Sequence, residues 1–368
     1  MTKAPNPGTL TADPIAGLEG VVAAHTSLSD VDGQNGRLIL RGKQIEDLAG
    51  RVWFEEAVLH LWHSYVFSDI DELKHAFGSV RQAAFSVVSV MEAASEGLGV
   101  YERMQLGLAA MSIPKDRPQA VTISGALPVF LAAAYRISEG KSPIAPDPQL
   151  SVAEDLLRML KGEEPDADHV AALDRYLVTI LDHGLNASTF TARVIGSTEA
   201  EMKQAVLGAM GALSGPLHGG APGPVLDMID AIGRPENADK WISDALLRKE
   251  RLMGFGHRIY RTRDPRADVL KAGLKKLGTN NPKVQLAEEI EAAALAALRK
   301  AKPDRALDTN VEFYTAVLLD AIGIDRTLFT PLFATGRNPG WCAHVMEQQA
   351  NGKLIRPASV YVGPQAEK

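Results

Sequence analysis

The sequence predicts an all-α fold, and three observations support that prediction. Most of the chain consists of stretches with helical apolar periodicity that are bounded by capping residues, glycine or proline. Strand-like stretches are few and short, namely RLILRG at 37–42 and ASVYVG at 358–363. No unit recurs at a period of about 20 to 50 residues, and no low-complexity linker divides the chain. A helical protein with very few strands is therefore expected.

The first two well-defined helices lie in the N-terminal half. The stretch ISGALPVFLAAAYRI at 123–137 is nearly apolar, contains Gly125 and Pro128, and is too short to span a bilayer, which predicts a buried helix. Further on, Ser151 and Glu154 have the spacing of a capping box. They predict a helix that begins there and ends near a glycine of the segment KGEEP.

Two more helices follow. Thr198 and Glu201 repeat the capping-box spacing and predict a helix that ends at Gly215 and Pro216. His218 is thereby placed just beyond a helix C-terminus. The stretch AEEIEAAALAALRKAKP, from residue 287, has acids early and bases late, which suits the helix dipole. A well-formed helix is expected there.

Composition narrows the possible functions. The 368 residues are 46% hydrophobic and 23% charged, which suits an ordinary globular protein of two domains or one large domain. The formal net charge is −6 and no long Lys/Arg tract occurs, so neither nucleic acid nor a membrane is an expected partner. The single cysteine, Cys342, and the lack of an apolar core in the first 14 residues predict a cytoplasmic protein without an internal disulfide.

Three of the nine histidines share one setting. His183, His218 and His257 each lie beside glycine and outside an amphipathic stripe, where irregular backbone can approach a ligand closely. The alternative for each is a structural histidine at a turn. His60 and His63 are three residues apart, but neither an HExxH spacing nor a cysteine set accompanies them, so no metal site is expected.

The segment around His257 is strongly basic. Residues 251–266 hold five arginines and one acid, Asp264, so the segment carries a net charge of +4. Arginine forks match carboxylates and phosphates, which predicts an anion-binding site. For Arg263 a solvated helix start, with Asp264 as cap and Pro265 in the first turn, is an equal alternative. Neither a GxGxxG nor a Walker sequence is present, so a nucleotide-fold phosphate loop is not supported.

Several motifs together resemble one known family. They are, in order, LSDVDGQNGRLILRG, GPLHGG, GFGHRIYRTRDPRA, TNVEFYTAVLLDAIGI and GRNPGWCAHVMEQQANGKLIRPASVYVGP. This pattern, which spans nearly the whole chain, resembles the citrate synthase family and its close relatives, the 2-methylcitrate synthases. The resemblance implies a large helical domain, 1–218 and 324–368, and a smaller mobile domain, 219–323, that closes over the site. It also implies a homodimer with two composite active sites.

The resemblance implies a reaction as well. The family condenses the α-carbon of an acyl-CoA with the keto group of oxaloacetate and then hydrolyses the thioester, with coenzyme A thioester as co-substrate and no metal or permanently bound cofactor. A carboxylate base needs the developing enolate to be stabilised as it forms. By the family motifs, His218 would hold the thioester oxygen, His257 would protonate the oxaloacetate carbonyl, and Glu312 would be the base.

Binding residues are carried over in the same way. His183, Arg266, Arg337 and Arg356 match the residues that bind oxaloacetate, the last supplied by the partner subunit. Three cationic forks around a small dianion are physically reasonable. Arg261 matches a contact to a coenzyme A phosphate, and Arg305 is expected to act similarly.

Two positions depart from the family pattern. Glu312 stands where the family usually has aspartate, and Ile180 stands where relatives often have histidine or tyrosine. The extra methylene moves the carboxylate, and a misplacement of about 1 Å can cost roughly a hundredfold in rate. The sequence therefore leaves open a citrate synthase, a 2-methylcitrate synthase that uses propionyl-CoA, a slow or altered enzyme, and a non-catalytic homologue that binds oxaloacetate or coenzyme A.

Overall fold

The computed structural model describes residues 16–18, 20–219, 222–278, 281–305, 307–364 and 366. The segment 1–14, for which the sequence predicts no signal peptide, lies outside them. The helices are α1 (Ile45–Leu48), α2 (Phe54–Leu61), α3 (Ile70–Phe85), α4 (Val88–Ala93), α5 (Val100–Ala110), α6 (Gln119–Ser138), α7 (Val152–Lys161), α8 (Ala167–Thr179), α9 (Ala187–Gly196), α10 (Met202–Leu213), α11 (Pro222–Ile232), α12 (Pro235–Leu247), α13 (Pro265–Leu274), α14 (Pro282–Ala301), α15 (Val311–Ala321) and α16 (Phe329–Asn351). Short 3-10 helices are η2 (Ala16–Leu18), η3 (Lys275–Leu277) and η4 (Arg326–Leu328). The predicted all-α fold is confirmed.

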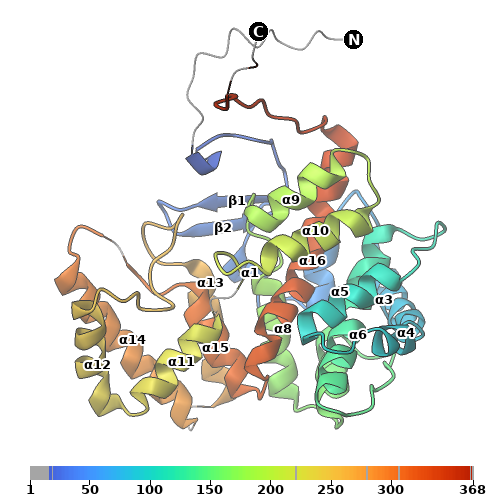
Figure 1. Cartoon of the computed structure of the whole chain (residues 1–368). Coiled ribbons are helices and arrows are strands. Elements are labelled where there is room, and N and C mark those ends of the chain that lie inside the picture. The colour runs from blue at the N-terminus through green and yellow to red at the C-terminus, as the bar shows by residue number, and fades with distance from the viewer. Residues whose placement is uncertain are drawn as a thin grey trace.

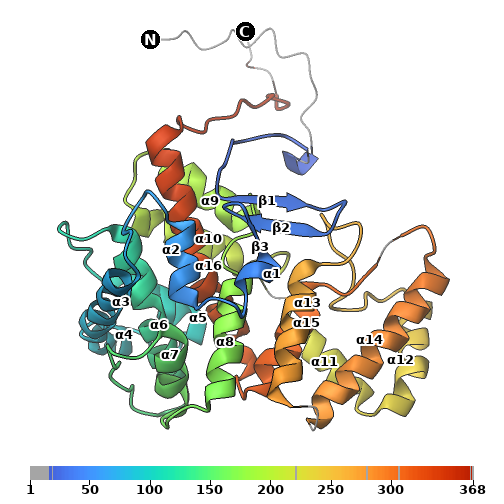
Figure 2. The ribbon, with the colours of Figure 1, turned by 180° about the vertical axis from the view of Figure 1, so that it is seen from behind.

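The helices form two groups (Figure 1). Helices α11 to α15 pack on one another at one side, while α3 to α7 lie at the other. Between them, α8 contacts α13 and α15, and the long α16 contacts α6, α8, α9 and α10. The view from behind shows the same order (Figure 2). The division into domains 1–218 with 324–368 and 219–323 stays a prediction.

Helix α6 is the central helix of the larger group. It spans 20 residues, so it is longer than the sequence predicts, and Pro128 lies inside it. Its length and apolar composition would suffice to cross a membrane, but 83% of its most apolar stretch is buried inside the protein. The expected buried helix is confirmed. The argument that this stretch is too short to span a bilayer was wrong, because the whole helix is long enough.

The capping predictions have mixed outcomes. Ser151 caps α7, since its hydroxyl accepts the N–H of Glu154 at 3.2 Å, and Gly162 ends that helix in the left-handed conformation. The capping box predicted at Thr198 is wrong. That hydroxyl donates to the carbonyl of Ile195 in the preceding α9, so it is not available to cap α10, which begins only after Glu201. The helix predicted from residue 287 is α14, which begins earlier, at Pro282.

One small antiparallel sheet holds the N-terminal segment against the body. It has the order β1 (Ser29–Asp32), β2 (Arg37–Leu40) and β3 (Lys43–Gln44), with Ser29 opposite Leu40. The strand predicted at 37–42 is thus confirmed as β2. The strand predicted at 358–363 is wrong, because these residues have no strand partner in the described part of the chain.

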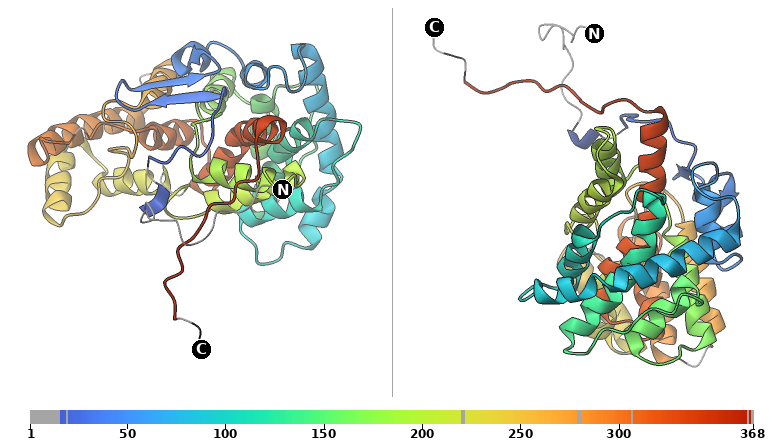
Figure 3. Two further views of the ribbon diagram at one scale, coloured as in Figure 1. Left: turned by 90° about the horizontal axis from the view of Figure 1, so that it is seen from above. Right: turned by 90° about the vertical axis from the view of Figure 1, so that its right-hand side faces the viewer.

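Residues 352–364, which we call the C-terminal arm, run away from the body as an extended chain (Figure 3). The arm carries large apolar side chains in solvent: Leu354 is 59% exposed, Tyr361 71% and Val362 92%. An extended apolar segment with so little cover is typical of a contact surface for another chain.

Candidate active site

Two of the glycine-flanked histidines meet at the centre of the molecule. His183, in the loop between α8 and α9, is buried, and its ring lies 5.7 Å from that of His257 in the loop before α13. Tyr260 packs against both rings, at 5.6 Å and 4.8 Å between centroids, and its hydroxyl lies 3.1 Å from Nε2 of His183. Burial holds the pKa of His183 well below its usual value, so this imidazole is neutral.

The hydrogen bonds of His257 fix its tautomer. Its Nδ1 accepts the backbone N–H groups of Ile259 and Tyr260, at 3.0 and 3.1 Å. A neutral imidazole that accepts at one nitrogen carries its proton on the other. Burial and the nearby Arg266 lower the pKa of His257 to about 4. With its proton on Nε2, His257 places one N–H donor beside another, Nη2 of Arg266, and the two nitrogens lie 3.3 Å apart.

His218 is held by a different set of groups. It lies in the turn after α10, where the N–H of Ser188 donates to its Nε2 at 3.3 Å and the hydroxyl of Ser188 lies 2.9 Å from the same nitrogen. That hydroxyl also accepts the indole N–H of Trp341 at 3.1 Å. Because Nε2 accepts, the proton of the neutral ring lies on Nδ1. Burial and the charge of Arg337 lower the pKa of His218 to about 4.

Asp264 positions two parts of the site at once. It caps α13 and forms a buried, two-oxygen ion pair with Arg266, at 3.0 Å to Nε and 2.8 Å to Nη2. The same carboxylate accepts the N–H of Val311 at the start of α15. Burial alone would lower the pKa of Arg266, but the ion pair with Asp264 raises it above its ordinary value. The guanidinium is therefore a fixed charge beside His257.

Glu312 lies in the first turn of α15. Its N–H donates to the cap residue Asn310 at 3.0 Å, and the side chain of Asn310 donates to the carbonyl of Gly256, one residue before His257. Glu312 as a whole residue is half-buried. Burial raises its pKa to about 7, against the opposing effect of Arg266. The structure thus places a carboxyl group that titrates near neutrality next to the histidine loop.

Arg337 completes the buried charges of the site. It is 1% exposed on α16, its Nε donates to the carbonyl of Ile180 at 2.5 Å, and its guanidinium lies 4.8 Å from the centre of the Phe333 ring. Burial lowers its pKa to about 10, which still leaves it charged at neutral pH. Within the described residues it has no carboxylate in ion-pair contact, so its charge is available to an anion.

The structure brings six of the predicted residues together and leaves three apart. The charge of Arg266 or Arg337 affects the pKa of each of the other four residues, so all six lie in one electrostatic environment. The six are His183, His218, His257, Arg266, Glu312 and Arg337. Arg261 and Arg305 are exposed, and Arg356 is exposed on the C-terminal arm. Arg263 pairs with Glu46 and Asp268 at the surface, so the solvated alternative holds for it.

Sequence reasoning did not identify the residues that orient this site. Ser188 sits in the segment NAST, and its role depends on contacts with His218 and Trp341, which are distant in sequence. Asp264 was expected only as a cap, although it also pairs with Arg266. Tyr260 lies inside the basic motif, three residues after His257, which was the one available sequence signal; its contact with His183 appears only in the structure.

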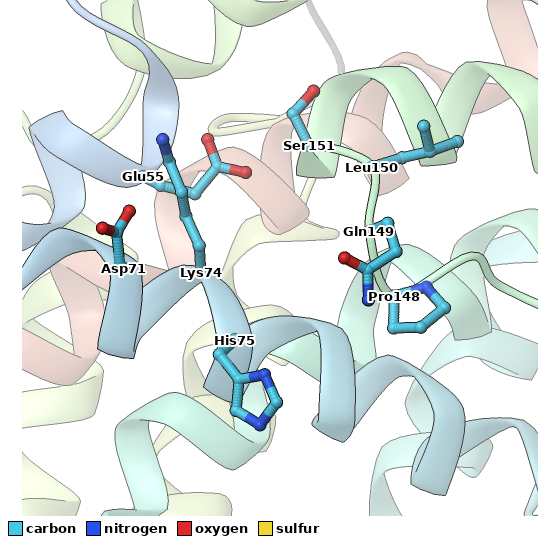
Figure 4. A pocket seen from close by; sticks show the side chains of 8 residues that line it. All are labelled: Glu55, Asp71, Lys74, His75, Pro148, Gln149, Leu150 and Ser151. Atoms are coloured by element: carbon cyan, nitrogen blue, oxygen red, sulfur yellow. The ribbon is translucent and has the colours of Figure 1, made fainter.

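Two other features of the described residues can be compared with this site: groups that could bind a metal ion, and a cavity elsewhere in the fold. Among the described residues no group of three His, Cys, Asp or Glu side chains has the geometry to hold a metal ion. A cavity of about 340 Å³ lies between α3, which carries Lys74 and His75, and the segment that leads into α7 (Figure 4). None of the sequence-predicted site residues lines it.

Comparisons with known proteins agree on one family. The family model "Citrate synthase, C-terminal domain" matches residues 17–358. The chain is 36% identical to citrate synthase 2 of Bacillus subtilis over 368 residues, which cover 96% of each chain. It is also 36% identical to 2-methylcitrate synthase of Mycobacterium tuberculosis over 360 residues, or 94% of this chain and 90% of that one.

Solved structures with the same fold include two citrate synthases. Citrate synthase from Thermotoga maritima superimposes with a TM-score of 0.84 at 35% identity and covers 96% of both chains. The ternary complex of carboxymethyl coenzyme A and oxaloacetate with citrate synthase from Thermoplasma acidophilum gives a TM-score of 0.84 at 28% identity, over 97% of this chain and 98% of that one.

Proposed function

The chain belongs to the citrate synthase family, and from this premise we propose that it condenses acetyl-CoA with oxaloacetate and water to give citrate and coenzyme A. One observation carries the proposal. A carboxyl group with a pKa near 7, two neutral histidines with defined tautomers and two buried arginines belong to one site. These are the groups that enolisation of a thioester and capture by a keto dianion require.

Glu312 acts as the base in this proposal. A general base works best when its pKa is near the operating pH, and burial brings this carboxyl group to about 7. The carboxylate takes a proton from the α-carbon of the acyl group, and the electron pair moves toward the thioester oxygen. The Nδ1–H of neutral His218 donates to that oxygen, because its Nε2 is already occupied by Ser188.

His257 and Arg266 polarise the second substrate. Their neighbouring donors, Nε2–H and Nη2–H, can share one acceptor, which we assign to the keto oxygen of oxaloacetate. The new carbon–carbon bond forms as the enolate carbon attacks this carbonyl, and His257 supplies the proton to the resulting alkoxide. Water then cleaves the citryl thioester and releases coenzyme A.

The remaining binding roles follow from charge and position. Arg337 and Arg266 hold the carboxylates of oxaloacetate, and His183 contributes a neutral ring beside them. The exposed Arg261 and Arg305 are free to meet the phosphates of coenzyme A, which is a co-substrate rather than a resident cofactor. Ile180 offers an apolar side chain, which packs at Gly336, and a carbonyl that orients Arg337.

We also propose a homodimer in which Arg356 completes the partner's oxaloacetate site. The support is the C-terminal arm, whose apolar side chains lack cover within the chain. A cytoplasmic location stays a proposal that rests on composition and on the single cysteine, Cys342, which is free and buried.

A thiol-release assay with oxaloacetate tests the function. Release of coenzyme A from acetyl-CoA that requires oxaloacetate would support a citrate synthase. Faster release from propionyl-CoA would favour the 2-methylcitrate synthase alternative, which the equal identity to relatives of both kinds keeps open. No release with either thioester, in a folded protein that binds oxaloacetate, would contradict the proposal and favour a binding homologue.

A further inference from the structure

A second cavity lies where three α-helices, a short 3-10 helix and a turn meet. It measures about 420 Å³ and is bounded by α1 and the turn after it, α8, α13 and η3. These elements contact one another, and α1, α8 and α13 are adjacent in the view from behind (Figure 2). Neither the catalytic histidines nor the oxaloacetate arginines line this cavity.

The guanidinium of Arg175 on α8 is built into the wall of this cavity. Arg175 is 8% exposed. Its side chain lies directly against Gly50 and Gly273, so close that a Cβ added at either glycine would collide with it. Its one hydrogen bond to the described residues is a long one, from Nη1 to the carbonyl of Val269 at 3.3 Å. A buried guanidinium has five N–H donors, so most of this capacity is unused within the described chain.

No carboxylate in the described residues forms an ion pair with Arg175. The neighbouring Asp174, whose charge opposes the lowering of the pKa of Arg175, instead accepts the N–H of Phe54, the first residue of α2, at 2.9 Å. Two acids line the cavity, Glu46 and Asp268, and both are paired with Arg263. Burial and the charge of Arg51 accordingly lower the pKa of Arg175 from its ordinary value.

Two further cations surround the same space. Arg51 and Lys276 line the cavity, and neither forms an ion pair with the described residues. The cavity therefore has three cations without acidic partners, and its two acids are already paired. Glu46 adds a buried oxygen, Oε2, that has no hydrogen-bond partner among the described residues and can accept from a hydroxyl.

We propose that this cavity binds a phosphate group, either as free phosphate or as a small phosphate ester. The Arg175 fork holds two phosphate oxygens, Arg51 and Lys276 contribute charge, and a protonated phosphate oxygen can donate to Glu46. The volume exceeds that of one phosphate, so a small ester also fits. This site is separate from the oxaloacetate arginines and does not depend on the proposed reaction.

Lysines 275 and 276 provide a matched test. Both are exposed and adjacent in η3, but only Lys276 lines the cavity. Inorganic phosphate is titrated into the full-length protein at constant ionic strength, with binding followed by calorimetry. We expect Lys276→Glu to weaken binding at least tenfold, while Lys275→Glu leaves it within about twofold, since the two variants change net charge equally.

Three outcomes overturn the proposal: no saturable binding to the unaltered protein, equal effects of the two lysine variants, and phosphate that oxaloacetate displaces but Lys276→Glu does not affect. The last result would place phosphate at the oxaloacetate arginines. Arg175→Gln, checked for folding by thermal unfolding, should also lose binding. Glycerol 3-phosphate serves as the second probe: tighter binding than phosphate would indicate an ester as ligand, and equal binding would indicate free phosphate.

Discussion

The hydroxyl oxygen of Ser188 lies 2.9 Å from Nε2 of His218, and the backbone N–H of Ser188 donates to the same nitrogen. The backbone N–H of Ser188 favours a His218 ring that carries its proton on Nδ1, while the hydroxyl, which also donates to Oδ1 of Asn186 at 2.8 Å, holds the ring in place. The free Nδ1–H is the donor that the proposed enolate needs. Ser188 is a positioning residue that acts through His218.

Loss of this hydroxyl should slow condensation. Ser188→Ala removes the side-chain contact but keeps the backbone N–H, so we expect kcat to fall roughly 10- to 100-fold, as for a modest misplacement of a catalytic group. The KM for oxaloacetate should change little, since other residues bind it. Thr191→Ala is the control, because that hydroxyl bonds only to the carbonyl of Ala187 in the same helix. Equal kcat values in both variants would contradict the role of Ser188.

The pH dependence of kcat/KM should follow Glu312. Its pKa of about 7 means that the base is increasingly protonated below neutrality, so kcat/KM should fall toward acid pH with a midpoint near 7. His218 and His257, with pKa values of about 4, stay neutral in this range. The folded state holds the proton of Glu312 more tightly than the unfolded state does, so the contribution of Glu312 to the free energy of unfolding should decline as pH rises from 4.5 to about 7. A flat kcat/KM profile between about pH 5 and 8 would exclude this assignment.

The turn between β1 and β2 should control oxaloacetate binding. The carbonyl of Gly33 accepts the N–H of Arg261 at 2.8 Å, and a Cβ at Gly33 would collide with the backbone of Ile259. Since the N–H of Ile259 orients His257, Gly33→Ala should raise the KM for oxaloacetate about tenfold or more. The control is Gly211→Ala, where an added Cβ meets nothing within 4 Å. If both variants keep the original KM, the turn does not position His257.

Subunit mixing tests the composite site. Arg356→Ala and His218→Ala should each be nearly inactive alone. Loss of the charge-assisted bond from Arg356 costs roughly 10- to 100-fold in affinity for oxaloacetate, and loss of His218 removes the proposed donor to the enolate oxygen. After full exchange of an equal mixture, half the dimers are mixed and each regains one intact site, so about a quarter of the original activity should return. Complete exchange without recovery, or an active monomer in sedimentation, would refute the shared site.

Local sequence signals predicted local structure well. Ser151 and Gly162 bound α7 because a cap and a left-handed glycine need only nearby residues. Thr198 failed as a cap because α9 competes for its hydroxyl. The apolar run in the C-terminal arm suggested a strand, but a strand requires a partner, which no local pattern supplies.

Sequence motifs predicted which residues form the candidate site, but they did not predict the pKa values or the proton positions of those residues. Motifs pointed to Glu312, His218 and His257 as candidate catalytic residues, but the pKa of about 7 for Glu312 comes from burial against side chains of other elements. The proton positions of His218 and His257 depend on Ser188 and on two backbone N–H groups. Such effects arise from packing between distant segments, so they become visible only in the folded chain.

The most direct test of the central claim is thiol release by Glu312→Gln. The amide keeps the shape of the side chain and loses its basicity, so we predict that oxaloacetate-dependent release of coenzyme A from acetyl-CoA falls at least a thousandfold. Oxaloacetate binding, measured by calorimetry on the same sample, should be retained because Arg266 and Arg337 are unchanged. Near-normal turnover in this variant would show that Glu312 is not the base.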